Sequence, residues 1–340
     1  GEARWKSRSL PGSCLFAYTG PMRGTAAPQT SRVRPGWKAW AGLVLAVLGI
    51  SGTSTYMKLA GTDPLVTTFW RLALAAVLLL PVDLVRRHRR AAGGGAGPSH
   101  TMRDPRVMAA GVFLALHFAL WVSSLSRTSV LSSLVFVTMD PLFVAVLDAL
   151  IMHERTGRLL WAAVLVALSG GVCIAVQAGA AANTGNLLAL GGALAASFYL
   201  IVGRSATRTM DAVSYNRATF TWAALVAGLF CLATRKPVLP LSAASFLWLV
   251  VTAFLGQTMG HGLINASLAS FQPQFVSLMM LWEPILGSLL AFLVLGDRPG
   301  PAELVDGAVI LAGLALGILA TARAAAGGAG HERPDDMTAG

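Results

Sequence analysis

Charge is scarce in this sequence. Only 12% of the 340 residues are charged, against about 25% in soluble domains, while 55% are hydrophobic. Apolar stretches of about 20 residues, the length that crosses a hydrocarbon core of about 30 Å, recur along the whole chain. A soluble helical core needs polar helix faces, which most of these stretches lack. The composition therefore predicts a polytopic helical membrane protein.

Residues for catalysis or cofactor binding are also missing. The three cysteines, Cys14, Cys173 and Cys231, have no metal-ligand spacing, and we interpret the last two as small apolar fillers. The sequence contains no His-Glu-x-x-His, Gly-x-Gly-Asp or serine-elbow motif. The glycine-rich stretch 91–99 lacks the lysine of a phosphate-binding loop. We therefore expect no enzyme, no metal and no cofactor.

The net charge of +11 is concentrated in the tails and a few loops. Such a distribution is typical of membrane topology signals and argues against a nucleic-acid partner. The partners we expect are the lipid bilayer and a small-molecule substrate. The oligomeric state, monomer or homodimer, stays open.

Two apolar stretches, 137–157 and 278–300, match each other at a constant offset of 143 residues. Each carries an acidic residue followed by proline near its middle, Asp140-Pro141 and Glu283-Pro284. Each ends in an acidic residue, an arginine, one further residue and a glycine. The match predicts an internal duplication, and both copies place an ionisable group where it is costly.

The apolar pattern predicts ten spans. We expect them near Trp40–Leu59, Pro64–Val85, Pro105–Leu125, Ser129–Met152, Leu159–Gln177, Asn186–Val202, Arg217–Ala233, Ala244–Leu263, Phe275–Leu295 and Pro301–Ala322. Because each copy holds an odd number of spans, the second copy enters from the opposite side of the membrane. The predicted fold class is an all-α integral membrane protein with ten transmembrane helices in two inverted five-helix repeats.

The domain organisation follows from these spans. Residues 37–178 form the first repeat and residues 184–323 the second. Residues 1–36 are predicted to be a basic, disordered tail, of which 1–21 precede Met22 and are a possible non-native extension. Residues 324–340 are predicted to be a disordered C-terminal tail.

Arginine sets the expected orientation. The loop after the second span is rich in arginine and should be cytoplasmic; its members are Arg86, Arg87, Arg89, Arg90, Arg103 and Arg106. Both termini then lie in the cytoplasm, and the chain sits in the cytoplasmic membrane, here expected to be a bacterial inner membrane. Arg235 and Lys236 fall on the outer side and are a mild exception.

The layout resembles the drug/metabolite transporter superfamily, EamA type. The resemblance is carried by segments 63–80, 115–155 and 260–314, including the Glu-Pro pair of the ninth span, and it covers residues 37–323. Asp140 stands where the family more usually has a small or hydroxyl residue, and Gly296-Asp297 replaces Gly-Glu. The resemblance implies a small-solute carrier, commonly an exporter. It leaves the solute open among amino acids, amines, purine-like metabolites and toxic compounds.

Asp140 and Glu283 are the leading candidate site residues. An ionised acid at the centre of a span costs about 2.5–3.5 kcal/mol on insertion scales, so each must be protonated, hydrated or paired. They are candidates for binding a cationic solute or a coupling proton; alternatively, the acid-proline pair is a packing device. Asp148, two turns beyond Asp140, would extend a polar track or pair with an interfacial arginine.

Further candidates for substrate binding have hydrogen-bonding or aromatic side chains within the spans. They are His117, Trp121, His261, Asn265, Arg71, Trp282 and Tyr199. The histidines suit polar-solute binding or proton movement, although helix–helix hydrogen bonding is an alternative. Arg71 would hold a substrate carboxylate or neutralise an acid, and Trp282 would stack on an organic cation or pack in the core.

These features favour a secondary transporter. It would move a small polar or cationic metabolite or drug by alternating access, with one repeat rocking against the other, as an exporter coupled to protons or to the solute gradient. The cavity would be lined by spans 1, 3, 4, 6, 8 and 9. A non-transporting sensor or scaffold on the same fold is the alternative, and an intramembrane enzyme is less favoured.

Overall fold

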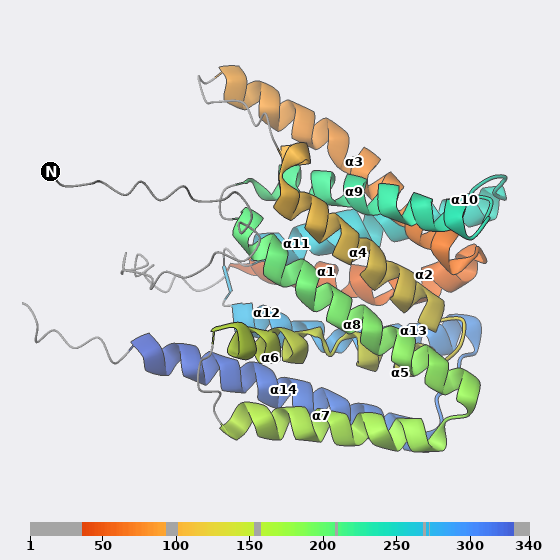
Figure 1. The fold of residues 1–340 in the computed structure, drawn as a ribbon, viewed down its shortest axis with the longest axis vertical. Coiled ribbons are helices and arrows are strands. Elements are labelled where there is room, and N and C mark those ends of the chain that lie inside the picture. Colours follow the sequence, from red (N-terminus) through yellow and green to blue (C-terminus); the bar gives the residue numbers. More distant parts are fainter. Residues whose placement is uncertain are drawn as a thin grey trace, which may run out of the picture. The chain divides into compact units, whose positions relative to one another are not determined.

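A computed structural model describes residues 36–92, 101–152, 158–207, 210–267, 270–271 and 273–329. This described part contains ten helices or helix groups long and apolar enough to cross a membrane (Figure 1). The ten predicted spans and the all-α membrane fold class are therefore confirmed. The tails 1–35 and 330–340 lie outside the described residues.

Six spans are single helices and four are divided. The single ones are α3 (Pro64–Ala92), α4 (Pro105–Ser124), α7 (Arg158–Gln177), α8 (Ala180–Thr207), α9 (Ala212–Ala233) and α14 (Pro301–Ala329). The divided ones are α1 (Trp37–Ser51) with α2 (Thr53–Ala60); α5 (Val130–Val137) with α6 (Asp140–Met152); α10 (Ala243–Val251) with the π-helix η2 (Thr252–Gly260) and α11 (His261–Ser267); and α12 (Pro273–Met280) with α13 (Trp282–Leu295). A short 3₁₀ turn, η1 (Thr101–Arg103), precedes α4.

Several helices run beyond their predicted bounds, and α3 and α14 run furthest past their predicted ends. The helix α3 continues past Val85 to Ala92, and α14 continues to Ala329, into the segment predicted to be disordered. Alanine and arginine, which dominate both extensions, have high helix propensity, so each helix extends beyond its apolar stretch.

The spans pack in an interleaved way rather than as two separate repeats. The span α8 packs on α4 and on α5–α6, and we call these three spans bundle A. The span α1–α2 packs on α10–η2–α11 and α12–α13, and we call these three spans bundle B. Each bundle thus contains helices from both repeats. Two further pairs, α3 with α9 and α7 with α14, complete the fold (Figure 1).

Matched glycines bring α7 and α14 into backbone contact. Gly170 and Gly313 occupy equivalent positions of the two repeats. A Cβ added at Gly170 would lie 2.7 Å from the backbone oxygen of Asp306, and one at Gly313 would lie 2.6 Å from the backbone nitrogen of Ala167. Close backbone approach through small residues is the usual way in which helices associate in lipid.

A buried ion pair joins α3 to α9. Asp83 is fully buried and accepts hydrogen bonds from the Arg217 guanidinium and, at 2.6 Å, from the Ser214 hydroxyl. Arg87, one turn along α3, lies 3.0 Å from the same carboxylate. Because a buried carboxylate is stable only when paired, this cluster fixes α3 against α9.

Charged and polar contacts at the opposite end join bundle B to bundle A. Lys58, at the end of α2, forms a 2.9 Å salt bridge with Asp297, which follows α13. Asp297 also accepts a hydrogen bond from the backbone nitrogen of Val130, at the start of α5. Glu303 of α14 accepts hydrogen bonds from the hydroxyls of Ser129 and Ser132. These contacts fix the start of α5 against the loop that follows α13 and against the start of α14.

The α7–α14 contact predicts a sharp difference between two glycine substitutions. Gly313→Ala forces the two backbones apart and should cost about 1–3 kcal/mol, as overpacking typically does. Gly300→Ala is the matched control, since nothing lies within 4 Å of its added Cβ. Thermal unfolding in detergent should show a lower midpoint for Gly313→Ala alone. Equal midpoints for the two variants would contradict the close backbone contact.

Candidate functional site

Two divided spans place the acidic residues. The break between α5 and α6 falls at Thr138 and Met139, so that Asp140 is the first residue of α6. The break between α12 and α13 falls at Leu281, so that Glu283 lies in the first turn of α13. Proline is tolerated in the first turn of a helix, where its missing N–H has no partner to lose. Each acid-proline pair therefore begins a half-helix in mid-span.

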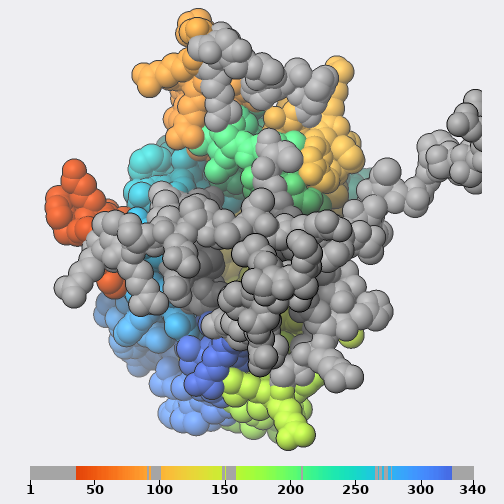
Figure 2. Space-filling model, turned by 90° about the vertical axis from the view of Figure 1, so that its left-hand side faces the viewer, coloured from red at the N-terminus to blue at the C-terminus, as the bar shows by residue number. Residues whose placement is uncertain are grey.

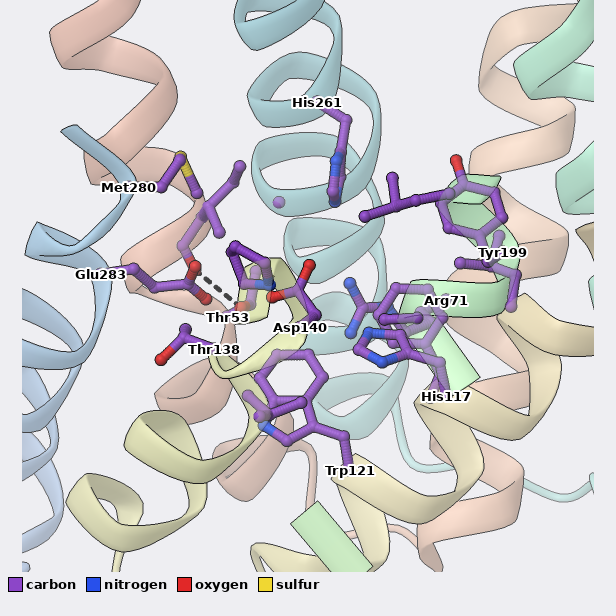
Figure 3. A pocket seen from close by; sticks show the side chains of 18 of the residues that line it. Thr53, Arg71, His117, Trp121, Thr138, Asp140, Tyr199, His261, Met280 and Glu283 are labelled. Atoms are coloured by element: carbon purple, nitrogen blue, oxygen red, sulfur yellow. Dashed lines mark hydrogen bonds between the residues drawn. The ribbon is translucent and has the colours of Figure 1, made fainter. Parts of the chain in front are cut away.

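Both half-helices open onto one cavity of about 250 Å³ between bundles A and B (Figure 3). Its polar and aromatic lining comes from seven spans. These residues are Thr53, Arg71, His117, Phe118, Trp121, Thr138, Asp140, Tyr199, His261 and Glu283. The predicted lining by spans 1, 3, 4, 6, 8 and 9 matches this set, with Arg71 of the second span in addition.

The two carboxylates face the cavity without a side-chain partner in the described part of the chain. Glu283 is 8% exposed, and Asp140 is partly buried. No described side chain donates a hydrogen bond to either carboxylate. Each lies at a half-helix N-terminus, where the backbone dipole stabilises negative charge by about 0.3–1 kcal/mol. The arrangement suits the binding of a cation or a proton.

Arg71 is fixed on the opposite side of the cavity from Glu283 (Figure 3). Its side chain is 1% exposed and donates to the Gln257 side-chain oxygen at 2.7 Å and to the Met57 sulfur at 3.4 Å. The guanidinium carbon lies 3.9 Å from the centroid of the Phe118 ring, in cation–π contact. Glu283 is close enough to act on it electrostatically, but does not bond to it.

The two predicted histidines both line the cavity, one from each repeat. The Nδ1 atom of His117 lies 2.9 Å from the backbone oxygen of Gly192. Because a carbonyl oxygen only accepts hydrogen bonds, Nδ1 carries the proton, which leaves Nε2 as an acceptor in the neutral ring. The His117 ring stacks on Trp121, with centroids 6.0 Å apart. His261 begins α11, directly after the π-helix η2.

The structure brings most of the predicted site residues together. Asp140, Glu283, His117, Trp121, His261, Arg71 and Tyr199 line the same cavity. Trp282 does not line it and is 50% exposed on the outside of the helices, so its predicted stacking beside Glu283 is wrong. Neighbouring residues on a helix point about 100° apart, so an inward Glu283 turns Trp282 towards lipid. The side chains of Asp148 and Asn265 lie outside the described set.

Sequence reasoning missed four residues of the site, of which Thr138 lines the cavity at the break between α5 and α6. Gln257 binds Arg71, Phe118 covers the guanidinium, and Thr53 lines the cavity just after the break at Gly52. Phe118 adjoins the predicted His117, which is a weak signal. Gln257, a lone amide within an apolar span, is a stronger one, because polar side chains in spans usually have a partner.

Ten apolar helices with a polar cavity at the ends of two half-helices define the class: a multi-pass membrane protein with the architecture of a solute carrier. The sequence matches the EamA-like transporter family twice, over residues 37–176 and 183–319. The chain belongs to this family, and the resemblance noted from its motifs is confirmed.

Two other comparisons complete the picture. A search among curated proteins found no match. A solved structure titled "Crystal structure of protein" is similar over 85% of this chain and 98% of its own, with 19% sequence identity and a TM-score of 0.57. At that identity the likeness shows a shared fold alone.

The cavity lining predicts which side chains water can reach. In a background with Cys14, Cys173 and Cys231 replaced, Thr138→Cys should react with a charged, water-soluble methanethiosulfonate reagent. Leu289→Cys is the control, because Leu289 lies on the same span as Glu283 and is 52% exposed on its outer side. The reagent reacts with the cysteine thiolate, which forms in water but not in lipid. We therefore expect Thr138→Cys to be labelled at least about tenfold faster than Leu289→Cys. Equal labelling of the two sites would contradict a hydrated cavity.

Proposed function

We propose that this protein is a secondary transporter that moves a small polar or cationic solute across the cytoplasmic membrane by alternating access. The observation that carries the proposal is the pair of acids Asp140 and Glu283, which have no side-chain partner among the described residues and reach one cavity from the broken spans of both repeats. Ionisable groups at mid-membrane are costly and mark substrate or ion pathways. A proton on one acid would couple transport to the proton gradient, with export as the net direction.

The packing favours bundles A and B as the moving units. The sequence suggested that one repeat rocks against the other, but α4 of the first repeat packs on α8 of the second. The cavity lies between the two bundles, so tilting of one against the other would open it on alternate sides. Lys58 holds Asp297 within bundle B, and Asp297 accepts a hydrogen bond from the backbone nitrogen of Val130 in bundle A. This hydrogen bond joins the bundles at one end and would have to break when that end opens.

Arginine on one end of the helices supports the proposed orientation. Figure 2 faces the end where α3 finishes (orange), α7 begins (lime) and α14 finishes (blue). The described arginines near this end are Arg86, Arg87, Arg89, Arg103, Arg106, Arg158, Arg204, Arg217 and Arg323. By the positive-inside rule we expect this end to be cytoplasmic, with the start of α1 and the end of α14 inside.

Lys236, one of the two basic residues that depart from the positive-inside rule at the other end, is paired with an acid. Lys236 follows α9 and forms a 2.8 Å salt bridge with Asp63, which precedes α3. The hydrogen bond to Asp63 raises the pKa of Lys236, so this lysine is charged but locally neutralised. A paired lysine adds little to the charge asymmetry between the two ends.

Reconstituted transport tests the proposal. Solutes that raise the unfolding midpoint, drawn from amino acids, polyamines, nucleobases and cationic drugs, would be assayed in proteoliposomes with and without a pH gradient. We expect gradient-stimulated transport that falls at least about tenfold in Glu283→Gln and Asp140→Asn, a loss of about 1.4 kcal/mol or more in transition-state stabilisation.

The matched control is Asp306→Asn. Asp306 lies on α14 and bonds Gln177, away from the cavity lining, so this variant should transport normally. Transport that ignores the pH gradient and survives Glu283→Gln would overturn the coupling. Absence of transport for every solute that binds would favour a sensor on the same fold.

A further inference from the structure

The guanidinium of Arg71 is deeply buried, and no described residue forms an ion pair with it. An arginine has five N–H donors. Of these, the described residues take one at Gln257 and one at the Met57 sulfur, while Nε has no partner. No described carboxylate lies within ion-pairing distance of it. Gln257 and Met57 are neutral, so they orient the cation without balancing its charge.

The second repeat contains an equivalent arginine that does form an ion pair. Arg217 occupies the equivalent position in the second repeat, 146 residues after Arg71. It forms an ion pair with the fully buried Asp83 of the neighbouring helix α3. At the same offset, the residue equivalent to Asp83 is Leu229, whose side chain is 61% exposed. Among the described residues, Arg217 thus has an acid in ion-pairing contact, whereas Arg71 has none.

An unbalanced buried cation is costly. Isolated charges in an apolar environment are retained only when paired or hydrogen-bonded, and removing one partner of a buried ion pair is strongly destabilising. Arg71 lies about two turns from the start of α3, where it is buried, and it lines the same cavity as Asp140 and Glu283. Three ionisable side chains with incomplete partners therefore surround one void.

We propose that the cavity recognises a zwitterion, with Arg71 binding its carboxylate while Asp140 and Glu283 receive its ammonium group. This inference rests on the proposed transport function and names its substrate class. A simple amine would leave Arg71 unbalanced, and a simple anion would meet two acids. With a zwitterion bound, the site retains one excess negative charge, which the coupling proton neutralises.

The size and surface of the cavity agree with this class. A cavity of about 250 Å³ lies just below the roughly 300–1,000 Å³ of ordinary ligand pockets, which favours a small solute such as an amino acid. The apolar part of the lining would cover its side chain; it includes Leu114, Val137, Leu200 and Met280. The guanidinium fork pairs with a carboxylate in two parallel hydrogen bonds, which gives geometric selectivity as well as charge.

Matched ligand sets test the assignment. One set is leucine, 3-methylbutylamine and 4-methylpentanoate; the other is phenylalanine, phenethylamine and 3-phenylpropionate. Each set keeps one side chain while removing the carboxylate or the amine. Binding to the purified full chain, measured by thermal shift and calorimetry, should favour the amino acid at least tenfold over both relatives in one or both sets.

Substitution of Arg71 then assigns the carboxylate contact. Arg71→Gln should lower amino-acid affinity to that of the amine while leaving amine binding in place, which also shows that the variant folds. Arg71→Lys should restore part of the preference. Arg298→Gln, at an exposed arginine outside the cavity, should change nothing.

The outcomes separate this inference from the function on which it rests. Amine binding equal to amino-acid binding, unchanged by Arg71→Gln but lost in Glu283→Gln, overturns the zwitterion while leaving a cation carrier. Failure of both sets to bind also overturns it. A chain that binds zwitterions selectively but transports none retains the site assignment and loses the transport function.

Discussion

The structure depends on one constraint: hydrocarbon does not hold an unbalanced charge. Asp140, Glu283 and Arg71 are built into spans whose outer surfaces are apolar, and each is turned inward to the same cavity. The divided spans follow from this constraint, because a half-helix N-terminus stabilises a carboxylate that a continuous helix would not. The cavity, the breaks and the two acid-proline pairs are thus parts of one solution to the cost of charge in lipid.

The duplication supplies a symmetric frame on which unequal charges are placed. Gly170 and Gly313 make equivalent backbone contacts, and Asp140 and Glu283 begin equivalent half-helices. Arg217 and Arg71 are also equivalent, but in the described part of the chain only Arg217 forms an ion pair with an acid. The symmetric contacts therefore stabilise the fold, and the asymmetric placement of charge forms the binding site. A carrier built from inverted repeats needs a symmetric fold for alternating access and an asymmetric site to select its solute.

Much of this arrangement was predictable from the sequence. Apolar length gave the ten spans, and the fixed offset of 143 residues paired Asp140 with Glu283 before any coordinates. Two features had no local signal, and a third, Gln257, carried a signal that did not identify its partner. The interleaving of the repeats depends on long-range packing. The π-helix η2 lies in a stretch whose apolar pattern is that of an ordinary helix. Gln257 binds Arg71 across a separation of 186 residues in the sequence. The error at Trp282 arose because adjacency in sequence was taken for a shared helix face.

The central claim is that Asp140, Glu283 and Arg71 border a hydrated hollow in mid-membrane. The most direct measurement is an experimental structure in a lipid nanodisc, at a resolution that shows ordered water. The account predicts water or a bound polar solute within hydrogen-bonding distance of all three side chains. Acyl-chain density against the two carboxylates, or a dry seam that closes over them, would contradict it.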